Sequence, residues 1–184
     1  MSEVQIKIGG EAGQGVILAG VVLAESAVRD ARHVAQSARY GAAVRGGEAT
    51  ADVVLSDAPI DHPHVEHPDA LVVLSQPIWE KLVPAQAPGT TVLFDPFFVS
   101  PGAAPDGVRV FEIDATERAI DRFGKGTAAN FIMLAALVEL TSAVGRGSLE
   151  AAVTETVSAR FRETNLAALD LGRELARAAS EAAR

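Results

Sequence analysis

The 184-residue chain contains no cysteine. It therefore supplies no thiolate ligand for an iron–sulfur cluster, no catalytic thiol and no disulfide bond. Any redox chemistry in which it takes part must use a cofactor held elsewhere. Aromatic residues are also few, with seven Phe, one Trp and one Tyr. A platform of stacked aromatic rings for single-stranded nucleic acid is therefore not expected.

Positive charge is scarce as well, since 16 Lys and Arg stand against 24 Asp and Glu, for a formal net charge of −8. Nucleic-acid binding needs a basic surface that displaces counterions, so this balance disfavours it. No apolar run reaches the roughly 20 residues that a membrane span needs. The N-terminus also lacks the basic and apolar regions of a signal peptide. We therefore expect a cytoplasmic protein that contacts neither nucleic acid nor membrane.

Short runs rich in β-branched residues recur between segments with helical patterns. We expect strands at residues 4–8, 51–55, 70–74, 90–94 and 108–113, with a further candidate strand at 30–38. Helical patterns occupy residues 16–28, 77–82 and 114–123. This alternation predicts an α/β fold with a mainly parallel sheet. The length is that of one domain, and no low-complexity linker divides residues 1–184.

The C-terminal part of the chain is expected to be helical. Residues 128–144 are apolar on almost every side, which predicts a central, buried helix. Ser148 and Thr164 are candidate N-caps of two closing helices, the last of which would cover residues 165–183. The Gly-Lys-Gly-Thr sequence at 124–127 resembles the end of a P-loop but lacks the preceding glycine, so we interpret it as a helix stop.

The first candidate site is the glycine-rich turn after the first strand, with the sequence Gly9-Gly10-Glu11-Ala12-Gly13-Gln14-Gly15. Such a turn leaves N–H groups free at a helix N-terminus, where the helix dipole favours a phosphate or carboxylate. The Gln14 amide can donate and accept hydrogen bonds at its mouth. An alternative interpretation stays open, in which the turn only lets the helix pack closely on the sheet.

A dinucleotide site at this turn is disfavoured. The glycine order reverses the usual G-x-G-x-x-G, and a ribose-binding carboxylate is expected about 20 residues further on. Residues 31–47 contain no carboxylate at all.

The second candidate site is the irregular loop at residues 40–48, which contains Tyr40, Arg45, Gly46 and Gly47. A guanidinium flanked by glycines can form paired hydrogen bonds with a phosphate or carboxylate. An ordinary solvated loop is the alternative. Asn130, in the first turn of the 128–144 helix, could likewise face a ligand or bond to backbone.

Other site types have weaker support. Residues 61–69 hold three histidines among carboxylates and prolines, but their spacings match no standard metal site, so we expect an exposed connection. A Ser-His-Asp hydrolase is unsupported because no G-x-S-x-G motif is present.

Taken in order, three motifs resemble the gamma subunit, or gamma domain, of the 2-oxoacid:ferredoxin oxidoreductases, the pyruvate, 2-oxoglutarate and indolepyruvate type. The family pattern reads approximately G-x-G-G-Q-G-V, Y-G-x-E-x-R-G-G and S-x-x-P-I. This chain has residues 8–16, residues 40–47 and Ser56-Asp57-Ala58-Pro59-Ile60 in these places. Ala12 replaces a glycine of the first motif, and Ala43 replaces the glutamate of the second.

The resemblance implies a Rossmann-like, three-layer domain without catalytic residues of its own. The complete enzyme would decarboxylate a 2-oxoacid oxidatively, form an acyl-CoA and pass electrons to ferredoxin. Thiamine diphosphate and iron–sulfur clusters would lie on alpha and beta subunits, with a ferredoxin-like delta subunit as a further candidate partner. The gamma part would support assembly or coenzyme A entry. Candidate binding residues are Gly9, Gly10, Gly13, Gln14, Gly15, Tyr40, Arg45, Gly46, Gly47 and Asn130, and no metal ligand is assigned.

Two competing functions remain at this point. One is a stand-alone module whose turn binds a nucleotide or another anion without redox partners. The other is a self-contained NAD dehydrogenase, against which the missing ribose-binding carboxylate argues.

Overall fold

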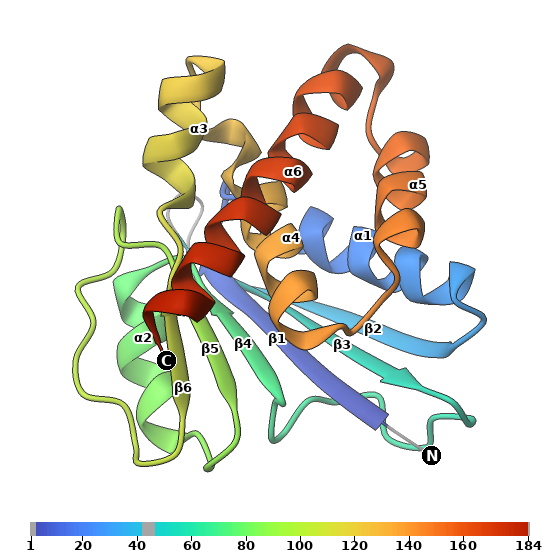
Figure 1. Cartoon of the computed structure of the whole chain (residues 1–184). Helices are drawn as coiled ribbons and strands as arrows, with labels where there is room; N and C mark the ends of the chain where they lie inside the picture. Colours follow the sequence, from blue (N-terminus) through green and yellow to red (C-terminus); the bar gives the residue numbers. More distant parts are fainter. Residues whose placement is uncertain (1–2, 42–46, 184) are drawn as a thin grey trace.

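The computed structural model describes residues 3–41 and 47–183 of the chain. Within these residues, six strands form one sheet in the order β2-β3-β1-β4-β5-β6 (Figure 1). Each of the strands expected from the sequence is present, with shifted ends. Their bounds are β1 Glu3–Glu11, β2 His33–Tyr40, β3 Glu48–Ser56, β4 Ala70–Val73, β5 Thr91–Phe94 and β6 Arg109–Glu112.

The sheet is mainly parallel, as expected. Strands β1, β4, β5 and β6 pair in parallel from one neighbour to the next. Strand β3 is antiparallel to both β1 and β2, so β2 runs in the same direction as β1. The β1-α1-β2 unit is therefore a parallel crossover whose two strands are separated by the reversed β3.

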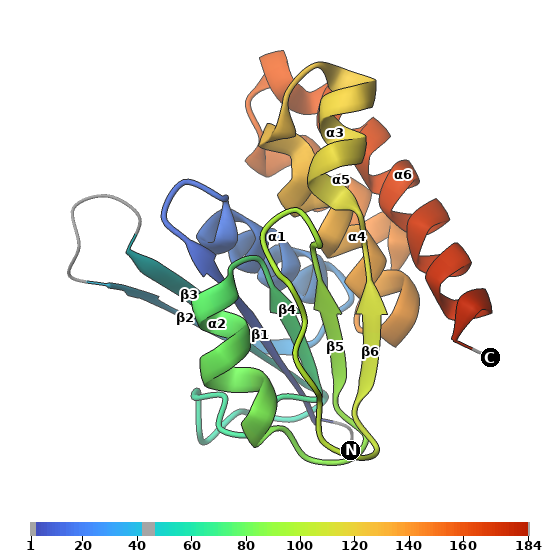
Figure 2. The same ribbon diagram turned by 90° about the vertical axis from the view of Figure 1, so that its left-hand side faces the viewer.

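Helices cover the sheet as two layers, which gives the predicted three-layer α/β fold (Figure 2). One layer contains α1, α4, α5 and α6, with α3 beside α4 beyond the strand ends, and α2 lies on the other face. The bounds are α1 Val16–Arg29, α2 Gln76–Leu82, α3 Ala115–Phe123, α4 Ala129–Thr141, α5 Arg146–Thr156 and α6 Ala159–Ala182. Two short 3₁₀ turns, Val83–Ala85 and Gly126–Ala128, precede β5 and α4.

Two hydrophobic clusters hold these layers together, because successive side chains of a strand point to opposite faces. Ile6 and Ile8 of β1 belong to the cluster under α1 and α4. Leu71 and Val73 of β4 belong to the cluster under α2, where the Trp79 and Phe94 rings meet edge to face at 5.3 Å. Every residue of α4 from 129 to 138 is buried, which confirms the predicted central helix.

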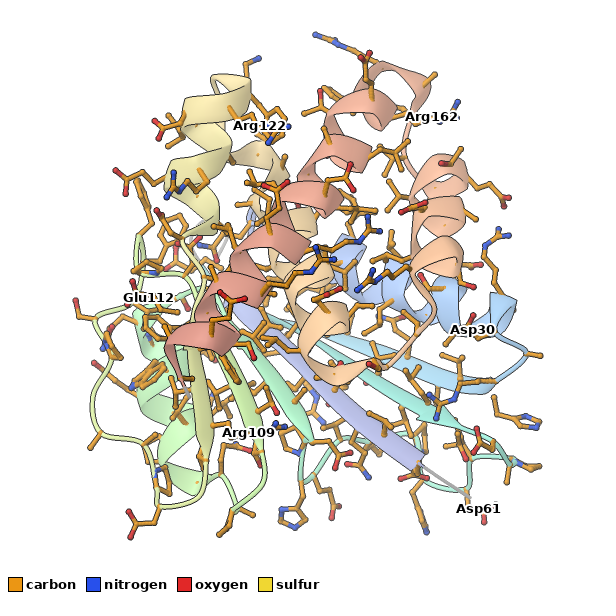
Figure 3. All side chains as sticks on the ribbon, viewed as in Figure 1. Asp30, Asp61, Arg109, Glu112, Arg122 and Arg162 are labelled. Carbon is orange, nitrogen blue, oxygen red and sulfur yellow. The ribbon has the colours of Figure 1, made fainter. Side chains whose placement is uncertain are left out.

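The predicted caps of the two last helices are wrong. Helix α5 begins at Arg146 after Gly145, and α6 begins at Ala159 after Ser158, so Ser148 and Thr164 lie inside helices. The Ser148 hydroxyl donates instead to the Asp30 carboxylate at the end of α1, which also accepts the Gly145 N–H at 2.6 Å (Figure 3). A carboxylate distant in sequence thus occupies the N-terminus of α5, where local capping rules cannot detect it.

Helices α4 and α6 approach closely at Gly172. A Cβ atom at this position would lie 2.2 Å from the Ile132 carbonyl oxygen and 2.9 Å from the Ala135 Cβ. In α5, by contrast, a Cβ on Gly147 would have no atom within 4 Å.

We expect Gly172→Ala to lower the free energy of unfolding by about 1–3 kcal/mol, since the clash is with backbone and overpacking is costly. Gly147→Ala is the matched control and should raise stability by about 0.5–1 kcal/mol through helix propensity. Urea denaturation of the two variants checks this. Equal stabilities would show that α4 and α6 do not pack through Gly172.

Glu139 connects three helices. Its carboxylate, on α4, accepts the Arg177 Nε of α6 at 2.9 Å and the Arg146 Nη2 of α5 at 2.7 Å, and only 11% of its side chain is exposed. Burial alone would raise the pKa of Glu139, but hydrogen bonds and charges from Arg177 and Arg146 hold it below its ordinary value of 4.5.

A lowered pKa in the folded state stabilises the fold above the unfolded-state pKa, and this contribution disappears as the pH falls through the folded-state pKa. We therefore expect Glu139→Gln to destabilise the protein by about 1 kcal/mol at pH 7. The difference in stability between this variant and the unmodified protein should disappear below pH 4. Thermal unfolding of both proteins from pH 7 to pH 3 measures this difference. A difference that does not change with pH would contradict the lowered pKa of Glu139.

Candidate functional site

A crevice opens where the chain changes face between neighbouring parallel strands. After β1 the chain enters α1 in the helix layer, whereas after β4 it enters α2 on the opposite face. Ligands of open α/β sheets bind at such a switch point, beyond the carboxyl ends of the strands. Here the cleft has a volume of about 250 Å³ and is lined by Gly13, Gln14, Leu74, Phe98, Thr116, Gly126, Thr127, Ala129 and Asn130.

The glycine turn follows the predicted strand-to-helix geometry. Gly13 has φ 101° and Gly15, the N-cap of α1, has φ 75°, a left-handed conformation that favours glycine. Ala12 is not among the described non-glycine residues with positive φ, which are Ala31 and Ser142. The alanine in place of the family's glycine therefore introduces no backbone strain.

Gln14 braces the turn with both ends of its amide. Its Oε1 accepts the Glu11 N–H at 2.6 Å, and its Nε2 donates to the Leu74 carbonyl at 2.7 Å. The side chain thereby joins the end of β1 to the end of β4. The amide that the sequence offered to a ligand is used within the protein, and Gln14 shapes the cleft wall.

Asn130 joins the start of α4 to the same turn. Its Nδ2 donates to the Gly15 carbonyl at 3.3 Å, and a Cβ on Gly15 would lie 2.4 Å from this nitrogen. Asn130 is 5% exposed, and its Oδ1 is buried without a hydrogen-bond partner. The Nδ2 end of the amide thus bonds to backbone, as in one of the two alternatives proposed, and contact with a ligand stays a prediction.

The remaining glycines of the motif have packing roles. A Cβ on Gly9 would lie 2.6 Å from the Ile78 Cγ2 of α2, and one on Gly10 would lie 2.5 Å from the Gln14 Oε1. Both lie within β1, and neither lines the cleft. The close-packing interpretation of the turn is therefore correct for these two positions.

The second motif lies beside the first. The Ala12 N–H donates to the Gly47 carbonyl at 2.9 Å, and the Gly41 N–H donates to the Glu48 carbonyl at 2.6 Å. Tyr40 is 70% exposed and lines a separate groove, next to α2, with Arg39 and Lys81. Arg45 and Gly46 lie outside the described residues. One described end of this loop, Gly47, therefore borders the glycine turn, whereas the other, Gly41, pairs with Glu48 of β3.

Asp95, which the sequence analysis did not identify, forms hydrogen bonds with two segments that line the cleft. It is fully buried after β5, and its carboxylate accepts the Thr116 N–H at 2.9 Å, the Thr116 hydroxyl at 2.6 Å and the Phe97 N–H at 3.1 Å. Burial raises the pKa of Asp95, although these hydrogen bonds oppose the shift. A polar residue directly after a buried parallel strand was the signal for it.

Asp95 positions two walls of the cleft. It holds the first turn of α3 at Thr116 and the turn that carries Phe97 and Phe98, whose rings meet edge to face at 5.0 Å. Phe98 is 40% exposed and lines the cleft.

The histidine-rich segment behaves as an exposed connection, as expected. His62, His64 and His67 line a shallow hollow with Asp61 and Glu66 at the other end of the sheet. Across residues 3–41 and 47–183, no group of three or more His, Cys, Asp or Glu side chains is placed to hold a metal ion. In the same residues, no helix is long and apolar enough to cross a membrane.

The crevice can therefore attract an anion. The N-terminus of α1 borders it at Gly13 and Gln14 and has no side-chain cap, so its first N–H groups contribute partial positive charge. Within the cleft-lining set, no side chain is arranged as a nucleophile with an adjacent base.

Known proteins resemble this chain over nearly its whole length. Residues 5–175 match the family model described as pyruvate ferredoxin/flavodoxin oxidoreductase. The 2-oxoglutarate synthase subunit KorC of Methanocaldococcus jannaschii is 38% identical over 175 residues, which cover 94% of each chain. The ketoisovalerate oxidoreductase subunit VorA of Methanothermobacter thermautotrophicus is 34% identical over 95% of this chain, which spans 37% of that longer protein.

The fold leads to the same group of proteins. The gamma subunit of a keto/oxoacid ferredoxin oxidoreductase from Geobacter sulfurreducens superposes with a TM-score of 0.85 and 31% identity, covering 97% of this chain and 99% of that one. The switch-point crevice, the glycine turn and the adjoining Tyr-Gly segment thus occur in a chain whose sequence and fold agree. The protein is a member of the pyruvate ferredoxin/flavodoxin oxidoreductase family and matches its gamma subunits from end to end.

Proposed function

We propose that this chain is the gamma subunit of a thiamine-diphosphate-dependent 2-oxoacid:ferredoxin oxidoreductase in the cytoplasm, and that residues 1–184 act as one gamma-type domain. The complex would decarboxylate a 2-oxoacid oxidatively to an acyl-CoA and reduce ferredoxin. The observation that carries the proposal is the match to gamma subunits over nearly the full length of both compared chains.

The residues of this chain do not suit the redox groups of such an enzyme. It has no cysteine for an iron–sulfur cluster, and its described residues contain no acidic or histidine cluster for a metal ion. Thiamine diphosphate and the clusters would therefore lie on alpha and beta subunits, with a ferredoxin-like delta subunit as a further partner. The gamma subunit contributes binding surfaces rather than reacting groups.

The switch-point cleft suits one part of the reaction, the binding of an anionic substrate. Coenzyme A carries phosphates, and a phosphate at a helix N-terminus such as that of α1 is stabilised by free N–H groups. Asn130 holds this N-terminus in place, since its Nδ2 donates to the Gly15 carbonyl. We infer that Gly13, Gly15 and Asn130 face the ligand, that Gln14 and Asp95 hold the cleft in shape, and that Arg45, in the adjoining loop, supplies a cation.

Among 2-oxoacids, we propose 2-oxoglutarate. Full-length relatives that are 35–38% identical are subunits of 2-oxoglutarate synthases, whereas those named as pyruvate synthase subunits are 26–27% identical.

Purification of the tagged chain from its native host tests the function directly. We expect it to retain thiamine-binding alpha and beta chains, and the recovered complex to reduce ferredoxin with 2-oxoglutarate faster than with pyruvate. Preference for pyruvate would refute only the substrate assignment. Recovery of the chain alone, without thiamine-dependent activity, would favour the stand-alone binding module.

The anion site predicts that Asn130→Asp weakens coenzyme A binding to the complex by about tenfold, because a carboxylate replaces a neutral amide near the bound phosphates. Arg45→Ala should weaken coenzyme A binding or subunit association while leaving the isolated fold intact. Isothermal titration and gel filtration measure the two effects.

Gln86→Glu is the matched control for Asn130→Asp, since it adds the same charge in a hollow lined by residues 67–69 and 86–90, apart from the cleft. It should leave coenzyme A affinity unchanged. Equal affinities of all the variants, with normal assembly, would exclude this cleft as the binding site.

A further inference from the structure

Strand β2 forms one edge of the sheet. It spans eight residues, His33–Tyr40, and pairs on one side with β3. Among the described elements, none pairs with its other side (Figure 1). The opposite edge strand, β6, has only four residues. A long edge strand without proline presents a row of unpaired N–H and C=O groups that can pair with another strand.

The pairing with β3 determines which groups are free. The Gly41 N–H donates inward to the Glu48 carbonyl, and Gly41 and Glu48 continue the register of the ladder. Bonded and non-bonded pairs alternate in an antiparallel ladder, so Arg39, Ser37 and Ala35 also point their backbone groups inward. The N–H and C=O groups of Val34, Gln36, Ala38 and Tyr40 therefore point outward.

An apolar stripe on α1 borders this edge. Gly20 faces β3 and β2, since a Cβ on it would lie 2.6 Å from Ala51 and 3.6 Å from the Gln36 amide nitrogen. Next to Gly20 on the helix surface, on the side away from α4 and α5, lies a stripe formed by Ile17, Val21, Ala24 and Val28. This stripe is only partly covered, and Val28 is 58% exposed. Spacings of 4, 3 and 4 residues place the four side chains on one side of the helix.

We propose that a second copy of this chain pairs with the β2 edge, antiparallel and about a two-fold axis. The two sheets become continuous through about eight hydrogen bonds between the free backbone groups. Because a two-fold axis perpendicular to the sheet keeps both helix layers on one face, the two α1 stripes lie on the same side of the new junction. The occupant is the chain itself because β2 is complementary to its own sequence.

The free groups allow only registers that pair an even-numbered residue with an even-numbered one. The register that uses the whole strand pairs Val34 with Tyr40 and Gln36 with Ala38. Aromatic and β-branched residues opposite each other are favourable in a sheet. Arg39 then faces Ala35 of the other copy, so no like charges are opposed.

Ser37 falls on the axis in this register, opposite its own equivalent. Facing side chains of a non-hydrogen-bonded pair have Cβ atoms about 4.5–5.5 Å apart, so the two small Ser37 side chains fit opposite each other on the axis.

The absence of cysteine makes cross-linking decisive. Ser37→Cys introduces the only thiol of the full chain, and mild oxidation should convert most of the protein to a disulfide-linked dimer. Ala35→Cys is the matched control, on the same strand and face, but its equivalents would lie about 13 Å apart. Equal cross-linking of both variants, or of neither, would overturn the proposal. Preferential cross-linking of Gln36→Cys or Ala38→Cys would overturn the register.

Analytical ultracentrifugation of the unmodified chain should show twice the 19.1 kDa mass of one copy. Ala38→Pro removes an outward N–H without touching the β3 ladder, and Val21→Glu adds charge to the exposed stripe. Each should raise the dimer dissociation constant at least tenfold, with an unchanged circular dichroism spectrum. A monomeric unmodified chain at 100 μM would overturn the proposal, whether or not the chain binds alpha and beta subunits.

Discussion

The Gln14 amide is the interaction on which the candidate site depends. Its two hydrogen bonds fix the end of β1 to the end of β4, the two strands between which the chain changes face. Without them the Glu11 N–H and the Leu74 carbonyl would each lose a partner in a part-buried place, at a cost of about 1–3 kcal/mol each. The Gln14 side chain thereby forms the part of the crevice wall that lies between these two strand ends.

Around that amide, glycines allow the other elements to approach. Gly9 admits Ile78 of α2, Gly10 admits Gln14, and Gly15 admits Asn130 of α4. The glycine motif therefore allows helices of both layers to pack closely against β1 and the turn that follows it. Close packing and the proposed anion binding both depend on this short segment, in which a Cβ on the cleft-lining Gly13 would meet no atom within 4 Å.

Much of this could be predicted from the sequence because it is local. The β-branched runs predict all six strands, and the apolar 128–144 segment predicts the buried α4. Elements that depend on distant partners could not be found in this way. The α5 N-terminus is bound by Asp30 from α1, and α3 is held by Asp95 from β5. Neither carboxylate forms a local capping pattern with the helix that it supports.

The candidate site likewise combines features that depend on local sequence with features that depend on distant residues. Gly13, Gln14 and Asn130 were named as candidate binding residues from turn chemistry and a helix start, and the structure places all three at one cleft. That the Gln14 amide is already bonded depends on the Leu74 carbonyl, 60 residues away. Gly47 borders the glycine turn only because β3 returns beside β1, a strand direction that periodicity does not reveal.

The reversed direction of β3 also governs the register of the strands on either side of it. Strands β1 and β2 do not pair with each other, and β3 lies between them and forms both ladders. Its inner face carries Val53 and Leu55, and its outer face carries Asp52. A slip of one residue would turn Asp52 into the core, away from Lys7. The alternation of inner-face and outer-face side chains in residues 48–56 therefore fixes the register of two ladders, and so of half the sheet, at once.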